Sequence, residues 1–180
     1  YLVRKDFILL VFLKNFKFKS NLIDLGDHLF TLKLTSNMFN NYKNIYYQIE
    51  DYHWWNVSRR NTILKLLNPM VSDGMKILDI GCSSGSLIKK INLNKSLDIH
   101  GIDISSKAIK YSKDKGIKNT QVMNANELNF NDKEFDIIIA SDVLEHIEND
   151  SEALLEWKRV LKDNGFAIIF VPAIMALWSH

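Results

Sequence analysis

A glycine-containing turn and an acid further along the chain carry the chemistry that this sequence suits best. Residues 76–87 read KILDIGCSSGSL, in which Gly81 allows backbone angles that other residues avoid and lets a ligand approach the main chain. Asp103 follows 22 residues after Gly81, close to the spacing of about 20 at which an acid binds a ribose. A carboxylate accepts hydrogen bonds from both hydroxyls of a vicinal diol. The pattern therefore predicts a nucleoside site, with the alternative that Asp103 only caps a helix starting near Ser105.

The same turn argues against two common phosphate sites. A dinucleotide fingerprint G-x-G-x-x-G that starts at Gly81 requires glycine at positions 83 and 86, and both are serine. A P-loop requires Gly-Lys followed by Ser or Thr, and the sequence contains no such tripeptide. We therefore expect a nucleoside without a phosphate chain, which disfavours a nicotinamide-dependent oxidoreductase.

Short apolar runs alternate with helix-like segments from residue 76 onward, and this alternation positions the turn. Ile77, Leu78 and Ile80 read as a strand buried on both faces, and Ser83 and Ser84 are expected to cap the helix that follows. Such alternation predicts an α/β protein with a doubly wound, mainly parallel sheet, whose strand ends form the ligand crevice. Further strands are expected at 97–103, 120–123, 135–140 and 166–171, and further helices at 106–115 and 151–162.

Several segments in the right order resemble the class I S-adenosylmethionine-dependent methyltransferases, over about residues 42–180. The resemblance implies a Rossmann-like sheet with strand order 3-2-1-4-5, the family's last two strands missing, and S-adenosyl-L-methionine as the cofactor. The lead-in HWW at 53–55 is similar to a bacterial branch that acts on small molecules. The matching segments are ILDIGCSSG at 77–85, GID at 101–103, NANEL at 124–128, FDIIIASDVLEH at 135–146 and RVLKDNG at 159–165.

The resemblance also implies which residues form the cofactor site. The Gly81 turn is expected to hold the methionine part, Asp103 the ribose, and position 124 the adenine amino group. Position 124 is Asn where the family usually has aspartate, so a charged contact is lost. Cys82 is interpreted as a packing residue rather than a reactive thiol. The full set implied for cofactor binding is Asp79, Gly81, Cys82, Ser83, Gly85, Asp103, Ile104, Asn124, Ala125 and Ser141.

Methyl transfer from a sulfonium is an in-line displacement for which the protein mainly aligns the reacting atoms. His146 is the candidate catalytic base because histidine titrates near neutral pH, and the alternative is a structural histidine in the turn after the fourth strand. Trp55 and Arg59 are expected to face the substrate from a helical lid, unless that helix only packs on the sheet.

A metal is not expected, although one alternative cation site stays open. Asp142, Glu145 and His146 have the spacing i, i+3, i+4, which places them on one face of a helical turn. Carboxylate and imidazole groups arranged in this way can bind a divalent cation.

Composition fits an ordinary soluble domain, with 47% apolar and 24% charged residues. Residues 1–70 hold 10 basic and 5 acidic side chains, and residues 71–180 hold 13 basic and 16 acidic ones. The mildly acidic second part suits a cationic cofactor, and the first part is too rich in aromatic residues to indicate a nucleic-acid partner. A single cysteine suits a reducing compartment, so we expect a cytoplasmic protein.

The sequence divides into an N-terminal extension and a methyltransferase-like domain. Residues 1–37 are poorly specified, and their apolar run at 7–13 is too short to span a bilayer. The domain covers 38–180, with a helical lid or lead-in at 38–70 and the cofactor-binding sheet at 71–180. Both ends are expected to be cut, which would leave the fifth strand as an unpaired edge.

The leading interpretation is a methyltransferase that uses S-adenosyl-L-methionine and acts on an unidentified small-molecule or lipid-like acceptor. A truncated or inactive cofactor-binding remnant is the alternative from another class. A nicotinamide-dependent oxidoreductase is a weaker one. The oligomeric state is not predicted.

Overall fold

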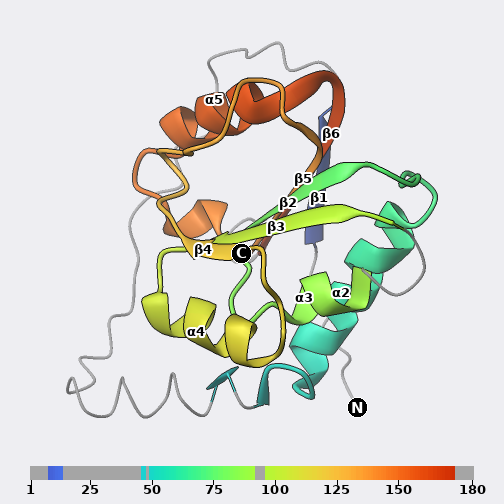
Figure 1. Cartoon of the computed structure of the whole chain (residues 1–180), viewed down its shortest axis with the longest axis vertical. Coiled ribbons are helices and arrows are strands. Elements are labelled where there is room, and N and C mark those ends of the chain that lie inside the picture. The colour runs from blue at the N-terminus through green and yellow to red at the C-terminus, as the bar shows by residue number, and fades with distance from the viewer. Residues whose placement is uncertain (1–7, 14–45, 48, 92–95, 173–180) are drawn as a thin grey trace, which may run out of the picture.

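The computed structural model describes residues 8–13, 46–47, 49–91 and 96–172, which form one sheet with helices on both faces (Figure 1). In these residues the sheet has six strands, in the order β1-β6-β5-β2-β3-β4. The strands are β1 Ile8–Leu13, β2 Lys76–Ile80, β3 Asp98–Asp103, β4 Thr120–Val122, β5 Phe135–Ser141 and β6 Leu161–Pro172.

Five neighbouring strands, β4-β3-β2-β5-β6, run parallel in the expected order 3-2-1-4-5. β2 lies at the centre, where Ile77 is in register with Ile99 of β3 and Ile137 of β5. Its apolar residues are buried on both faces of the sheet, as the run of isoleucine and leucine predicts. The predicted fold class and strand order are therefore confirmed.

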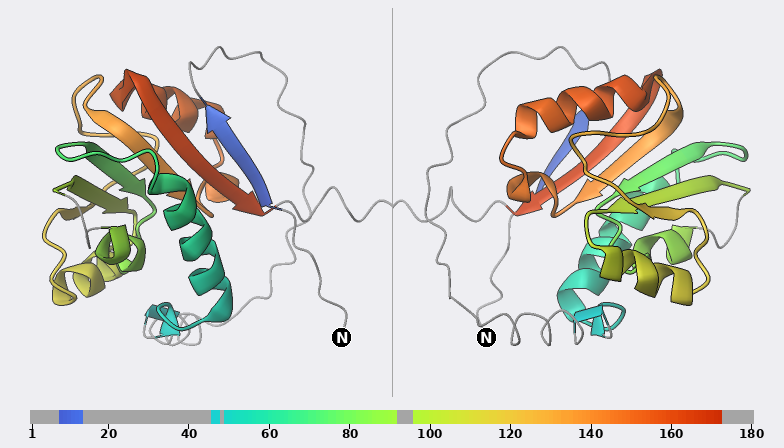
Figure 2. Two further views of the ribbon diagram at one scale, coloured as in Figure 1. Left: turned by 90° about the vertical axis from the view of Figure 1, so that its right-hand side faces the viewer. Right: turned by 60° about the vertical axis from the view of Figure 1, so that its left-hand side comes forward.

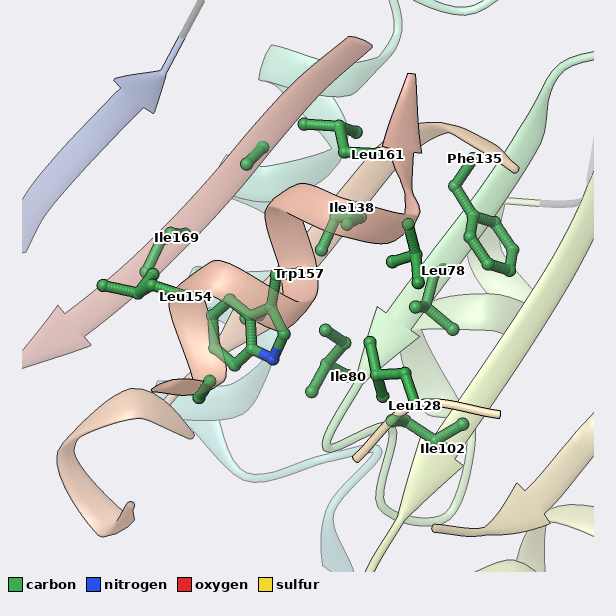
Figure 3. Close-up of a cluster of buried hydrophobic side chains, with 14 residues drawn as sticks. Leu78, Ile80, Ile102, Leu128, Phe135, Ile138, Leu154, Trp157, Leu161 and Ile169 are labelled. Carbon is green, nitrogen blue, oxygen red and sulfur yellow. The ribbon is translucent and has the colours of Figure 1, made fainter. Parts of the chain in front are cut away.

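The helices form two layers that give each face of the sheet its own core (Figures 1 and 2). On one face, Trp157 of α5 belongs to the same buried cluster as Leu78 and Ile80 of β2 (Figure 3). On the other face, Ile63 of α2 packs in a cluster with Ile77. Because side chains alternate along a strand, Asp79 points to the α2 side of the sheet. The helices are α2 Trp54–Leu67, α3 Ser86–Ile91, α4 Ser106–Asp114 and α5 Asp150–Val160, with a 3₁₀ turn η1 at Leu144–His146.

Several helix ends follow directly from local sequence. α2 ends at the C-cap Asn68, just before Pro69, because proline has no N–H with which to continue the helical hydrogen bonds. The Ser105 side chain caps α4 by accepting a hydrogen bond from the Ala108 N–H at 3.2 Å. Gly116 follows α4 with a φ of 85°, the left-handed conformation that glycine adopts after a helix.

The boundary between α5 and β6 differs from the prediction. The helix expected at 151–162 ends at Val160, and the strand expected from Phe166 begins at Leu161. Leu161 is in register with Phe135 of β5 and Phe166 with Ile137, so the residues between them form an irregular segment of the ladder. Leu161 therefore belongs to the strand rather than to the helix.

The expectation that β6 is an unpaired edge is wrong. β1 pairs with β6 in antiparallel register from Ile8–Pro172 to Leu13–Ala167, and Figure 2 shows the two strands side by side. Part of the 1–37 extension thus belongs to the sheet, while the rest of it lies outside the described residues. A run of six apolar residues was long enough for a strand, but nothing in its sequence identified β6 as its partner.

Within the described residues, no helix is long and apolar enough to cross a membrane.

Deleting residues 1–13 should uncover the hydrogen-bonding edge of β6 and promote self-association, because an open apolar edge is a template for pairing. Size-exclusion chromatography with light scattering should show a larger mean mass than for the whole chain. Deleting residues 1–7 alone leaves β1 in place and is the matched control. An unchanged mass for the longer deletion would contradict the assigned pairing.

Candidate functional site

The carboxyl ends of the parallel strands border a cleft of about 670 Å³. This is the expected position for a ligand in such a sheet, at the point where the strand order reverses. Most of the predicted site residues meet there. Those that line the cleft are Arg59, Gly81, Ser83, Asp103, Ile104, Asn124, Ala125, Ser141 and His146.

A smaller recess of about 40 Å³ adjoins the cleft and shares Arg59, Gly81 and Ser141 with it. Asp79 and Cys82 line this recess rather than the cleft itself. Burial and the negative charges of neighbouring acids raise the pKa of the Cys82 thiol, which agrees with a packing role.

Two predicted residues line neither space. Gly85 has a φ of 76°, and a side chain there would collide with Ile117, so this glycine serves close packing. Trp55 instead makes an edge-to-face contact with Trp54, with ring centroids 5.8 Å apart.

The turn after β2 is held in an unusual backbone conformation. Gly81 has a φ of 71°, and a side chain there would collide with Val143. Ser83 is also left-handed, with a φ of 50°, which is costly for a residue other than glycine. The expectation that Ser83 and Ser84 cap α3 is wrong, because both hydroxyls donate to the carboxylate of Glu50.

Asp103 stabilises this turn through both carboxylate oxygens. One oxygen accepts from the Ser83 N–H at 2.9 Å and the other from the Ser105 N–H at 2.8 Å. The carboxylate thus supports the entry to α4, although Ser105 provides the cap itself. A carboxylate has about four lone-pair sites, so about two remain for a ligand in the cleft.

Asp79 is a buried acid in an electrostatically unfavourable position. It is 3% exposed, and its Oδ2 atom has no hydrogen-bond partner among the described residues. Burial, together with the charges of Glu50 and Asp103, raises the pKa of Asp79 to about 8, against the opposing charge of Arg59. The Asn56 Nδ2 and Ser141 Oγ atoms, on residues that line the same recess, are also buried without a partner there. A recess with this lining, which also includes Arg59 and Arg60, is suited to a small polar group.

Arg59 and Asp142, which both line the cleft, form an ion pair. Asp142 has a φ of 54° and lies outside the η1 turn that contains Glu145 and His146. These three residues therefore do not share one helical face, which removes the premise of the alternative cation site. Across the described residues, no cluster of histidine, cysteine and acidic groups is placed to hold a metal.

Sequence reasoning missed several residues of the cleft and its surroundings. Tyr46 lines it from the lead-in, and burial followed by the charge of Glu50 raises its pKa. Asn124 lines the cleft as predicted, but its Oδ1 already accepts from the Asn126 N–H at 3.1 Å. The missed residues belong to no recognisable motif. Some of them could have been suggested by their positions just after β4 and η1. The lining residues not predicted as cofactor, substrate or catalytic residues are Tyr46, Ile80, Ile102, Met123, Asn126, Asp142, Val143, Ile147, Glu148 and Asn149.

Similar proteins point to one enzyme family. Over 135 residues the chain is 29% identical to the ubiquinone biosynthesis O-methyltransferase of Rickettsia bellii, covering 64% of this chain and 55% of that protein. The chain thus spans about half the length of the curated relatives it matches. The comparisons give no support to the oxidoreductase or to the inactive remnant.

Solved structures share the fold. A protein of Pyrococcus horikoshii OT3 is 25% identical with a TM-score of 0.61, covering 72% of this chain and 64% of that one. A SAM-dependent methyltransferase from Aquifex aeolicus is 20% identical with a TM-score of 0.54, covering 76% and 72%.

The sequence profile described as the methyltransferase domain matches residues 78–169, which run from β2 through most of β6. This span contains the turn after β2, Asp103 and the strand ends that border the cleft. The chain therefore belongs to the methyltransferase domain family, whose cofactor is S-adenosyl-L-methionine.

Proposed function

We propose that this chain is the catalytic domain of an S-adenosyl-L-methionine-dependent methyltransferase that acts on a small-molecule acceptor. The observation that carries the proposal is the cleft at the strand ends, where the Gly81 turn and Asp103 lie together beside a recess of unpartnered polar atoms. The cofactor is cationic at its sulfonium and ammonium groups, which suits the carboxylates around this turn.

The residues present fit the cofactor group by group. Asp103 has lone pairs left to accept from the ribose hydroxyls. In the recess, Asp79 Oδ2 and Ser141 Oγ can accept hydrogen bonds from an ammonium group, and Arg59 can bind a carboxylate. Asn124 remains the candidate for the adenine amino group, with one lone pair of its oxygen already used by Asn126.

The bound cofactor supplies a methyl group activated by a sulfonium sulfur. The protein's part is to orient this group, exclude water and hold the acceptor in line. His146 and Arg59 line the cleft, and both stay proposals: His146 as the base for an acceptor hydroxyl, Arg59 as a contact to substrate or cofactor. Trp55 is proposed only as part of the lid, because it does not line the cleft.

The acceptor class follows from the curated relatives rather than from the cleft. The Rickettsia bellii relative is named an O-methyltransferase of ubiquinone biosynthesis. We therefore propose a hydroxyl oxygen as the acceptor atom, on a small or lipid-like molecule. Incubation with methyl-labelled S-adenosylmethionine and a panel of phenolic acceptors tests this, with His146→Ala expected to lower turnover without weakening cofactor binding.

A cytoplasmic location remains a prediction.

Replacing Asp103 by alanine should weaken binding of S-adenosylhomocysteine by about 1.5–3 kcal/mol, the value of a hydrogen bond to a charged group. Calorimetric titration measures the dissociation constant. A 2′-deoxyribose analogue of the ligand separates a direct contact from a disturbed turn, because the variant should discriminate less against it than the wild type does. Equal discrimination by both proteins would contradict the ribose assignment.

Replacing Asp79 by asparagine should stabilise the cofactor-free protein at alkaline pH. The folded chain keeps the Asp79 proton up to about pH 8, whereas an unfolded aspartate loses it near its ordinary value of 3.8. The stability that this proton provides is therefore lost as the pH rises from about 4 through about 8.

Thermal unfolding between about pH 5 and pH 9 tests this prediction, because the Asp79→Asn variant has no ionisable group at this position and its profile should be flatter. The exposed Asp163→Asn variant is the control and should follow the wild type. Parallel profiles for Asp79→Asn and wild type would show that Asp79 is ionised in the folded protein.

A further inference from the structure

Glu50 is a buried acid that lines neither the cleft nor the recess. It is 6% exposed and lies in the turn before α2, where its N–H donates to the Tyr46 carbonyl at 2.8 Å. Its Oε2 atom accepts hydrogen bonds from the hydroxyls of Ser83 at 3.1 Å and Ser84 at 2.6 Å. One carboxylate oxygen thus joins the lead-in to the turn that follows β2.

This turn needs support because of Ser83. Its φ of 50° is a conformation that a side chain disfavours, and such strain persists only where the surroundings fix it. Asp103 holds the main chain of Ser83 through its N–H, and Glu50 holds the side chain. The residue is therefore fixed by two carboxylates, one from the sheet and one from the lead-in.

A second layer of contacts fixes Ser84 and Asp51, the neighbours of Glu50. The Lys115 ammonium group at the end of α4 lies 2.6 Å from Ser84 Oγ and 3.0 Å from Asp51 Oδ2. Arg60 of α2 donates to the main-chain oxygen of Asp51 at 3.0 Å. Although burial opposes it, hydrogen bonds from Ser86 and Lys115 hold the pKa of Asp51 below its usual value. Of the two acids of the lead-in, Asp51 thus lies among cations that compensate its charge, whereas Glu50 is held by serine hydroxyls.

We propose that Glu50 is a positioning residue, which holds the Ser83–Ser84 turn in its cofactor-binding shape through hydrogen bonds and without touching the cofactor. The effect of Glu50 on the shape of the turn can be tested without a ligand, whereas its effect on cofactor affinity rests on the proposed function. Since Ser84 is fully buried and absent from the lining of the cleft, its hydroxyl serves this contact rather than a ligand.

The first test is amide hydrogen exchange of the cofactor-free chain at Ser83 and Gly85, whose N–H groups are bonded within this region. Glu50→Ala should speed exchange at both positions. Glu50→Gln should stay near wild type, because its amide oxygen can accept from the same hydroxyls. In a Ser83→Gly background, Glu50→Ala should have a smaller effect, because glycine adopts a positive φ without strain.

The second test is calorimetric titration of the same variants with S-adenosylhomocysteine. Glu50→Ala should weaken binding about tenfold or more, and Glu50→Gln should weaken it less than about threefold. In the Ser83→Gly background, Glu50→Ala should cause a smaller loss of affinity. Asp163→Ala removes a carboxylate at the opposite ends of the strands and should change neither readout. Thermal unfolding identifies variants that fail to fold. If Glu50→Ala is among them, Ser84→Ala removes the shorter bond instead and should also speed exchange.

Each outcome decides one claim. Unchanged exchange and affinity in Glu50→Ala would overturn the proposal, and so would Glu50→Gln behaving like Glu50→Ala, because the charge rather than the hydrogen bonds would then matter. Absence of binding by the wild type would overturn the proposed function, and the exchange rates would still decide the role of Glu50.

Discussion

The concentration of three acidic side chains around the turn after β2 is the constraint on which this site depends. Glu50, Asp79 and Asp103 approach the turn from the lead-in, β2 and β3, and their mutual repulsion adds to the cost of burying Asp79. Hydrogen bonds offset part of this cost at Glu50 and Asp103, but Asp79 Oδ2 has no partner in the described residues. A cationic ligand would complete the arrangement, which connects the electrostatics of the fold to its function.

The sequence was sufficient to predict the parallel sheet and the turn that borders the cleft, because both depend on local patterns. A buried run such as Ile77–Ile80 and a positive-φ residue such as Gly81 are visible in short windows. The roles of Ser83 and Ser84 were not predictable in this way. Their hydroxyl partner, Glu50, is more than 30 residues away, and only the packing of the lead-in on the sheet brings it there.

The same limit applies to the edge of the sheet. The apolar run of β1 lies in a segment that the sequence left poorly specified, and an antiparallel partner more than 150 residues away leaves no local signal. The α5–β6 boundary was misplaced for a related reason, since pairing of Leu161 with β5 outweighs its fit to the helical pattern. The N-terminal part of the chain therefore contributes twice, through β1 to the sheet edge and through Glu50 to the turn.

The central claim is that a cationic nucleoside cofactor binds beside Asp79. Calorimetry of the wild-type chain with S-adenosylmethionine at pH 7, in two buffers of different ionisation enthalpy, tests this claim most directly. With a pKa of about 8, Asp79 is mostly protonated before binding. The account predicts 1:1 binding with net release of protons, and no binding of NAD. Binding of NAD instead, or binding of S-adenosylmethionine without proton release, would contradict it.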